Sequence, residues 1–202
     1  MDDSDEDGRV ARLLFRTDSD SSADEVESAV VQDEEPRSSS EVVVVRQILH
    51  VQVEEVAVGG SIEHRLWPAA EYLASFVLRL CQQDAPSGNE QVATLSFLRN
   101  FLRSSSTLNV LELGAGVGLT GLEIASQIKH SRVLLTDLES ALPLLKRNLC
   151  RNQRRFLENA VRAQRLEWGN DDDIERALEW IDTSAPLLIL GSDCVYWEHL
   201  HR

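Results

Sequence analysis

A glycine-rich turn and one downstream acid are the residues in this chain best suited to chemistry. The mostly apolar run Val110 to Leu113 leads directly into Gly114-Ala115-Gly116-Val117-Gly118. Glycines leave backbone N–H groups of such a turn, and of the helix that follows, open to a closely bound ligand. A second apolar run ends in Asp137, 19 residues beyond Gly118. A carboxylate there can accept hydrogen bonds from ribose hydroxyls, so the pattern predicts a nucleotide-cofactor site at the crevice of a doubly wound sheet.

The glycine spacing is compatible with more than one kind of site. Residues 116–121 satisfy the dinucleotide pattern G-x-G-x-x-G, but the first glycine of that pattern should follow the strand directly. A loop that begins at Gly114 has Glu112 just inside the strand and three glycines at alternate positions. That version looks like the first motif of class I S-adenosylmethionine methyltransferases. A turn that needs glycine only for packing is a third interpretation, and Asp137 could instead cap the next helix.

The loop lies within a regular alternation of apolar strands and amphipathic helices. We expect strands near 109–113, 132–136, 161–166 and 186–191, and helices near 119–128, 142–152 and 174–181. This alternation predicts an α/β fold, a Rossmann-like doubly wound and mostly parallel sheet with helices on both faces. Upstream, the valine-rich residues 42–58 predict one or two strands, in a hairpin, up to the turn Gly59-Gly60. Helices are expected from Pro68 to Cys81 and over 91–102.

Charge divides the 202 residues into two parts. Residues 1–40 have a net charge of −9 out of −14 for the whole chain and contain few large apolar residues. We expect them to form a disordered acidic tail, and residues 41–202 to form the folded domain. The net negative charge argues against nucleic acid as a partner. Five cations between Lys146 and Arg155 predict either a solvated helix face or a docking face for an acidic partner.

The remaining composition bears on location. The three cysteines, Cys81, Cys150 and Cys194, fit neither a disulfide framework nor a zinc site, so we expect a reducing compartment and no metal. The acidic N-terminus does not resemble a signal peptide, and no apolar run is long enough to span a membrane. A cytoplasmic location is expected, with the nucleus as a further location.

Three further motifs allow a comparison with one particular protein family. The chain contains Trp67-Pro68-Ala69, Leu166-Glu167-Trp168 and Asp193-Cys194-Val195-Tyr196. Together with the loop Glu112 to Gly118 and with Asp137, they resemble the seven-strand lysine methyltransferases of family 16, particularly the methyltransferase-like 21 group. The resemblance covers roughly residues 41–202. It implies S-adenosylmethionine as cofactor and a lysine in a protein as substrate.

The resemblance also implies roles for individual residues. The cofactor-binding residues would be Trp67, Glu112, Gly114, Ala115, Gly116, Gly118, Asp137, Trp168 and Ser192. An indole suits a sulfonium or an adenine because its ring offers stacking area and a negative face, although either Trp could be an ordinary core residue. We expect Asp193 and Tyr196 to be catalytic by orienting the lysine nitrogen. The alternative is that Asp193 caps a helix and Tyr196 packs in the core.

One feature departs from that family. The chain ends at Arg202, six residues after Tyr196, whereas the family continues with three further strands. We therefore expect a C-terminally truncated, partial domain whose activity is open. The alternative function is that of a non-catalytic methyltransferase-fold protein that binds a protein partner.

Overall fold

The computed structural model describes residues 42–58, 61–82, 90–104 and 106–195. The chain divides into two units, Met1–Pro36 and Arg37–Arg202, and every described residue belongs to the second. The predicted acidic tail, the turn Gly59-Gly60 and the predicted catalytic Tyr196 lie outside the described residues.

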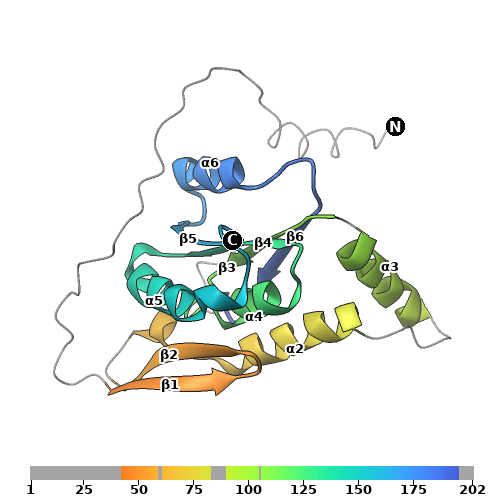
Figure 1. Ribbon diagram of the computed structural model, residues 1–202. Helices are drawn as coiled ribbons and strands as arrows, with labels where there is room; N and C mark the ends of the chain where they lie inside the picture. The colour runs from red at the N-terminus through yellow and green to blue at the C-terminus, as the bar shows by residue number, and fades with distance from the viewer. Residues whose placement is uncertain (1–41, 59–60, 83–89, 105, 196–202) are drawn as a thin grey trace. The chain divides into compact units, whose positions relative to one another are not determined.

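Four parallel strands form the central sheet, in the order β5-β4-β3-β6 (Figure 1). They are β3 (Leu108–Leu113), β4 (Ser131–Asp137), β5 (Val161–Arg165) and β6 (Leu187–Gly191). Each lies within one residue of its predicted ends. Strand β3 pairs with both β4 and β6, so the strand order reverses at β3. The parallel α/β architecture expected from the sequence is confirmed.

The two faces of the sheet belong to two hydrophobic cores. Val110 and Val133 contribute to the larger core, whereas their neighbours Leu111 and Leu134 contribute to the smaller one. This alternation follows from the two-residue period of a strand. Helices α2 (Pro68–Gln82), α4 (Leu119–Gln127) and α5 (Leu142–Asn152) cover the first face, and α3 (Glu90–Ser104) packs beside α2. Helix α6 (Asp171–Trp180) covers the other face (Figure 1).

Helix α6 begins three residues earlier than expected. We predicted a helix from residue 174, and the structure begins it at Asp171. The reason is the N-cap Asn170, whose side-chain oxygen accepts the backbone N–H of Asp173 at 3.1 Å. Such a cap satisfies one of the unpaired amides at a helix start and lets acidic residues occupy the first turn.

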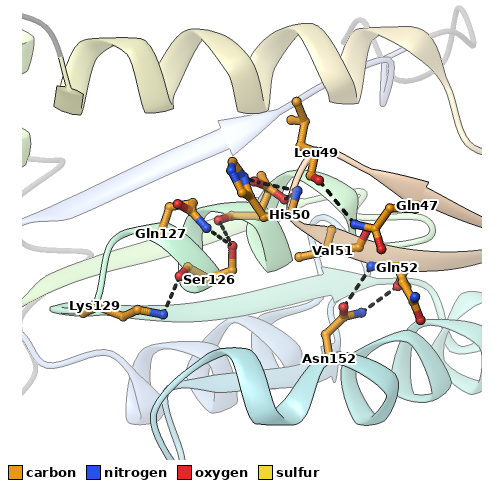
Figure 2. A network of polar contacts seen from close by, with 10 residues as sticks. Gln47, Leu49, His50, Val51, Gln52, Ser126, Gln127, Lys129 and Asn152 are labelled. Atoms are coloured by element: carbon orange, nitrogen blue, oxygen red, sulfur yellow. Dashed lines mark hydrogen bonds and ion pairs between the residues drawn. The ribbon is translucent and has the colours of Figure 1, made fainter.

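The valine-rich segment forms the expected antiparallel hairpin, β1 (Val42–Ile48) with β2 (Val51–Val58). Its turn lies at Leu49-His50, with Leu49 at φ +48°. A leucine in that region of φ is unusual, so the sequence carries little signal for the turn. Side chains of two helices hold the hairpin in place (Figure 2). Asn152 of α5 accepts the amide of Gln52 at 2.9 Å and donates to its carbonyl at 2.6 Å, while Glu123 of α4 accepts the amide of His50 at 3.0 Å.

A second set of contacts joins the hairpin to the glycine loop. Asn148 is fully buried, and its side chain accepts the amide of Glu54 at 2.6 Å and donates to the carbonyl oxygens of Glu54 and Val117, each at 2.9 Å. Arg147 and Arg151 bind the Glu54 carboxylate at 3.1 and 3.0 Å. Two of the five helix cations are therefore used inside the fold.

Candidate functional site

A cavity of about 360 Å³ lies at the carboxyl ends of all four parallel strands. Ligands of open α/β sheets bind at this edge, beside the point where the strand order reverses. The strand ends contribute ten lining residues, and the segment before α2 contributes three. The lining residues are Gly114, Gly116, Asp137, Leu138, Leu166, Glu167, Trp168, Ser192, Asp193 and Cys194, together with Ile62, Glu63 and Trp67.

Two glycines of the loop make this cavity possible. Gly114 has φ +62° and Gly116 has φ +54°, both in the left-handed region. A Cβ on Gly114 would lie 2.6 Å from the Cβ of Cys194, and one on Gly116 would lie 3.2 Å from the carbonyl oxygen of Glu63. Glycine thus allows the turn after β6 and the segment before α2 to approach the loop closely.

Three residues predicted to bind the cofactor lie outside the lining. The Glu112 carboxylate is buried and accepts the amide of Gly121 at 2.9 Å. Gly118 faces the core, where an added Cβ would lie 2.5 Å from Leu145 Cδ1. Ala115 donates its amide to the carbonyl oxygen of Thr136 at 2.9 Å. These contacts hold the loop in shape, and the predicted cofactor-binding role of the three residues stays a prediction.

Asp137 lies at the end of β4 and lines the cavity. Its two carboxylate oxygens accept the amides of Gly116 and Leu138, each at 2.7 Å. Burial raises the pKa of this carboxyl, and those hydrogen bonds act in the opposite direction. The residue does not cap α5, whose N-cap position is Ala141. A carboxylate has about four acceptor positions, so Asp137 can still accept from a ribose hydroxyl.

Two tryptophans form part of the cavity wall. Trp67 is 39% exposed and Trp168 is 38% exposed, so neither is an ordinary core residue. Trp67 donates its indole N–H to the carbonyl oxygen of Ile62 at 3.1 Å. The adjacent amide of Leu66 donates to the buried Glu55 of β2 at 2.9 Å. The hairpin therefore positions the wall that carries Trp67.

The wall that carries Trp168 is held by Asp173, which we did not predict as a site residue. Its fully buried carboxylate accepts the amide of Glu167 at 2.9 Å and also contacts Arg165, at 3.4 Å, and Arg176. The Glu167 amide and the two guanidinium groups hold the pKa of Asp173 below its usual value. The available signal in the sequence was the acidic run 171–173 after Asn170, which has the spacing of a helix cap.

The turn after β6 completes the cavity. Asp193 has φ +51°, a conformation that Asp tolerates better than most residues and that is often found at functional sites. Cys194 packs against Gly114, and burial raises the pKa of its thiol, which favours the protonated form. Ser192 also lines the cavity, as predicted. Leu138 and Glu167 adjoin predicted residues, but no motif marks Ile62 or Glu63.

The lining has a distinct chemical character. Its described residues include four acids, Glu63, Asp137, Glu167 and Asp193, and among them there is no lysine, arginine or histidine. Acids beside two indoles suit a ligand that combines an aromatic base, hydroxyl groups and a positive charge. These lining residues therefore fit S-adenosylmethionine.

Within the described ranges, no group of three or more His, Cys, Asp or Glu residues is placed to hold a metal ion. No helix of the described part has the length and apolar character needed to cross a membrane.

Comparison with known proteins gives concordant results. A family model described as lysine methyltransferase matches residues 46–201. The chain is 29% identical over 141 residues to protein-lysine N-methyltransferase EFM6 of Saccharomyces cerevisiae, covering 66% of this chain and 52% of the relative. It is 37% identical over 89 residues to protein N-lysine methyltransferase METTL21A of Danio rerio, covering 44% of this chain and 37% of the relative. It is 32% identical over 94 residues to calmodulin-lysine N-methyltransferase of Arabidopsis thaliana, covering 46% of this chain and 29% of the relative. The chain spans about half or less of the length of these relatives.

Proposed function

Because the chain belongs to the lysine methyltransferase family, we propose that it transfers a methyl group from S-adenosylmethionine to a lysine side chain of a protein substrate. The observation that carries this proposal is the cavity, where the glycine loop, the acid after β4 and two exposed indoles meet. The names of the relatives, which are protein-lysine methyltransferases, favour this activity over a purely binding role.

The lining residues divide between the parts of the cofactor. Trp67 and Trp168 offer ring faces to the adenine and to the positive sulfur. Asp137 accepts from the ribose hydroxyls, and Gly114 and Gly116 admit the methionine part beside the backbone, with Ser192 close by. When bound, the cofactor supplies a methyl group on a positively charged sulfur that leaves as a neutral thioether.

The substrate lysine needs a neutral nitrogen for this reaction. A lysine of pKa about 10.4 is only about 0.1% deprotonated at pH about 7.4, so the site receives an ammonium that must lose a proton. Asp193 lines the cavity, and in this scheme its carboxylate accepts a hydrogen bond from that ammonium and orients it. Once the proton has passed to water, the lone pair can align with the methyl carbon. Positioning supplies most of the rate under this scheme, and Tyr196 is the proposed second orienting group.

The cofactor assignment is tested by calorimetric titration of the full 202-residue chain with S-adenosylhomocysteine. NAD serves as the control ligand, and circular dichroism reports folding. We expect micromolar binding of S-adenosylhomocysteine alone. Asp137→Ala should weaken it by about ten- to a hundredfold through loss of charge-assisted hydrogen bonds. Asp137→Asn keeps an oxygen for the Gly116 amide and should lose less. A folded chain that binds neither ligand would contradict the proposal.

The activity is tested by transfer of tritiated methyl groups from labelled S-adenosylmethionine into lysines of a protein lysate. Asp193→Asn is the informative variant, because Asn also tolerates a positive φ while its side chain carries no charge. We expect normal cofactor binding and at least about a tenfold slower transfer. Transfer at the normal rate would remove Asp193 from the mechanism without affecting the cofactor assignment.

A further inference from the structure

Glu63 is a cavity residue to which the proposed function assigns no role. It lies in the short helix η1 (Ile62–His64), just before Trp67, and it lines the cavity. Ser61 donates its hydroxyl to Glu63 Oε1 at 3.0 Å. Burial alone would raise the pKa of Glu63, but its own backbone amide, the hydroxyl groups of Ser140 and Ser61 and the charge of His64 bring that pKa below its usual value. The side chain is therefore ionised at neutral pH.

Contacts to Ser140 and within η1 fix this short helix, which lies beside the glycine loop. His64 Nε2 lies 3.1 Å from the carbonyl oxygen of Ser140, and the amide of His64 donates to the carbonyl oxygen of Ser61 at 3.1 Å. The carbonyl oxygen of Glu63 itself abuts Gly116. The charge of Glu63 also raises the pKa of Asp137, which shows that the two carboxylates influence each other. Glu63 is thus held close to both the loop and the ribose-binding acid.

The other cavity carboxylates already have roles or partners. Asp137 is assigned to the ribose and Asp193 to the lysine, while Glu167 binds Arg165 at 2.6 Å. Glu63 forms no ion pair within the described part of the chain, and its hydrogen bond from Ser61 is neutral, while the neighbouring His64 contributes a positive charge from outside the lining. An ionised carboxylate in a cavity whose described lining contains no cation attracts a positively charged ligand group.

We propose that Glu63 makes the cavity selective for charge, favouring the sulfonium cofactor over its thioether product. This inference rests on the proposed function. Methyl transfer breaks the carbon–sulfur bond, leaves that electron pair on sulfur and removes its positive charge. Adenine, ribose and amino-acid groups are otherwise the same in both molecules. A carboxylate near the sulfur therefore stabilises the cofactor complex more than the product complex, which promotes exchange of product for fresh cofactor.

The test is calorimetric titration of the full chain with S-adenosylmethionine and with S-adenosylhomocysteine. Glu63→Gln should weaken binding of S-adenosylmethionine by about three- to thirtyfold, as expected for one partly solvated charge. Binding of S-adenosylhomocysteine should change by less than about twofold, so the ratio of the two affinities falls. The matched control is Glu139→Gln, the same substitution at an exposed residue outside the lining, which should leave the ratio unchanged.

A second measurement uses the unaltered chain. Raising salt from about 50 mM to about 500 mM screens partly exposed charges, so the preference for the sulfonium ligand should decrease. This arm remains informative if Glu63→Gln fails to fold. Equal losses for both ligands, or a ratio that neither the substitution nor salt alters, would overturn the inference. An unaltered, folded chain that binds neither ligand would overturn the proposed function as well, so the two failures are distinct.

Discussion

The buried carboxyl of Glu112 should make the stability of the fold depend on pH. Burial raises the pKa of Glu112 from 4.5 to about 7, although hydrogen bonds from Gly121 and Thr120 oppose the increase. The folded state therefore holds this proton more tightly than the unfolded state. Between these two pKa values the unfolded chain binds fewer protons, so the free energy of unfolding falls as pH rises. Above about pH 7 this contribution levels off.

The size of the effect follows from the pKa values. A change from 4.5 to about 7 corresponds to about 3 kcal/mol. About 2.5 kcal/mol of this falls between about pH 5 and about pH 8, because the unfolded carboxyl is already largely ionised at the lower value. Glu112→Gln removes the titrating group and keeps an oxygen for the amide of Gly121, which lies 2.9 Å from the carboxylate.

The assay is urea unfolding of both proteins at several pH values, followed by circular dichroism. The stability of Glu112→Gln relative to the unaltered chain should increase by about 2 to 3 kcal/mol from about pH 5 to about pH 8. Glu139→Gln, at an exposed position, should show a constant difference. If the difference for Glu112→Gln is also constant, or decreases with pH, the reasoning about this buried carboxyl is wrong.

Four further predictions concern glycines near the cavity and the contacts that support its walls. Gly169→Ala should lower the free energy of unfolding, measured in urea, by about 1 to 2 kcal/mol, because Gly169 has φ +82° but open space around it. Gly114→Ala should lower the free energy of unfolding by more than Gly169→Ala does, because its Cβ would collide with the turn after β6. For the same reason it should weaken the binding of S-adenosylhomocysteine. Asp173→Asn should weaken the same binding severalfold in calorimetry by loosening the Trp168 wall. Since the pKa of Asp173 lies below 3.8, its stabilising effect should be lost as pH falls through that range, so the variant and the unaltered chain converge in acid. Asn148→Ala should lower the free energy of unfolding by about 2 to 4 kcal/mol in urea, because it removes three hydrogen bonds to buried backbone groups.

The sheet and the place of the site were predictable because their signals are local. Short, nearly continuous apolar runs indicate strands that are buried on both faces, and helical spacing of apolar residues indicates the helices between them. The segment from Val110 to Gly118 carries a strand and its glycine turn within nine residues. Parallel strands joined by helices bring their carboxyl ends to one edge, so a site at Gly114 and Asp137 followed from the sequence.

Only the tertiary structure shows which glycines of the loop line the cavity and which one packs in the core. Gly114, Gly116 and Gly118 look equivalent in sequence, at alternate positions of one motif. The first two meet Cys194 and Glu63 at the cavity, whereas Gly118 meets Leu145 in the core. These neighbours lie far away along the chain, and no local pattern identifies them.

The same limit applies to charged residues. Arg147 and Arg151 read as part of a basic surface, but they bind Glu54, more than 90 residues earlier in the chain. Glu63 carries no motif and Asp173 only the spacing of a helix cap, and both become site residues only because η1 and α6 pack beside the glycine loop and Trp168. The sequence by itself determined the elements, their order and the edge of the sheet where the cavity lies, since periodicity and glycine conformation act over a few residues. Tertiary packing decided which acids face the cavity and which are neutralised, since electrostatic environment depends on neighbours in space.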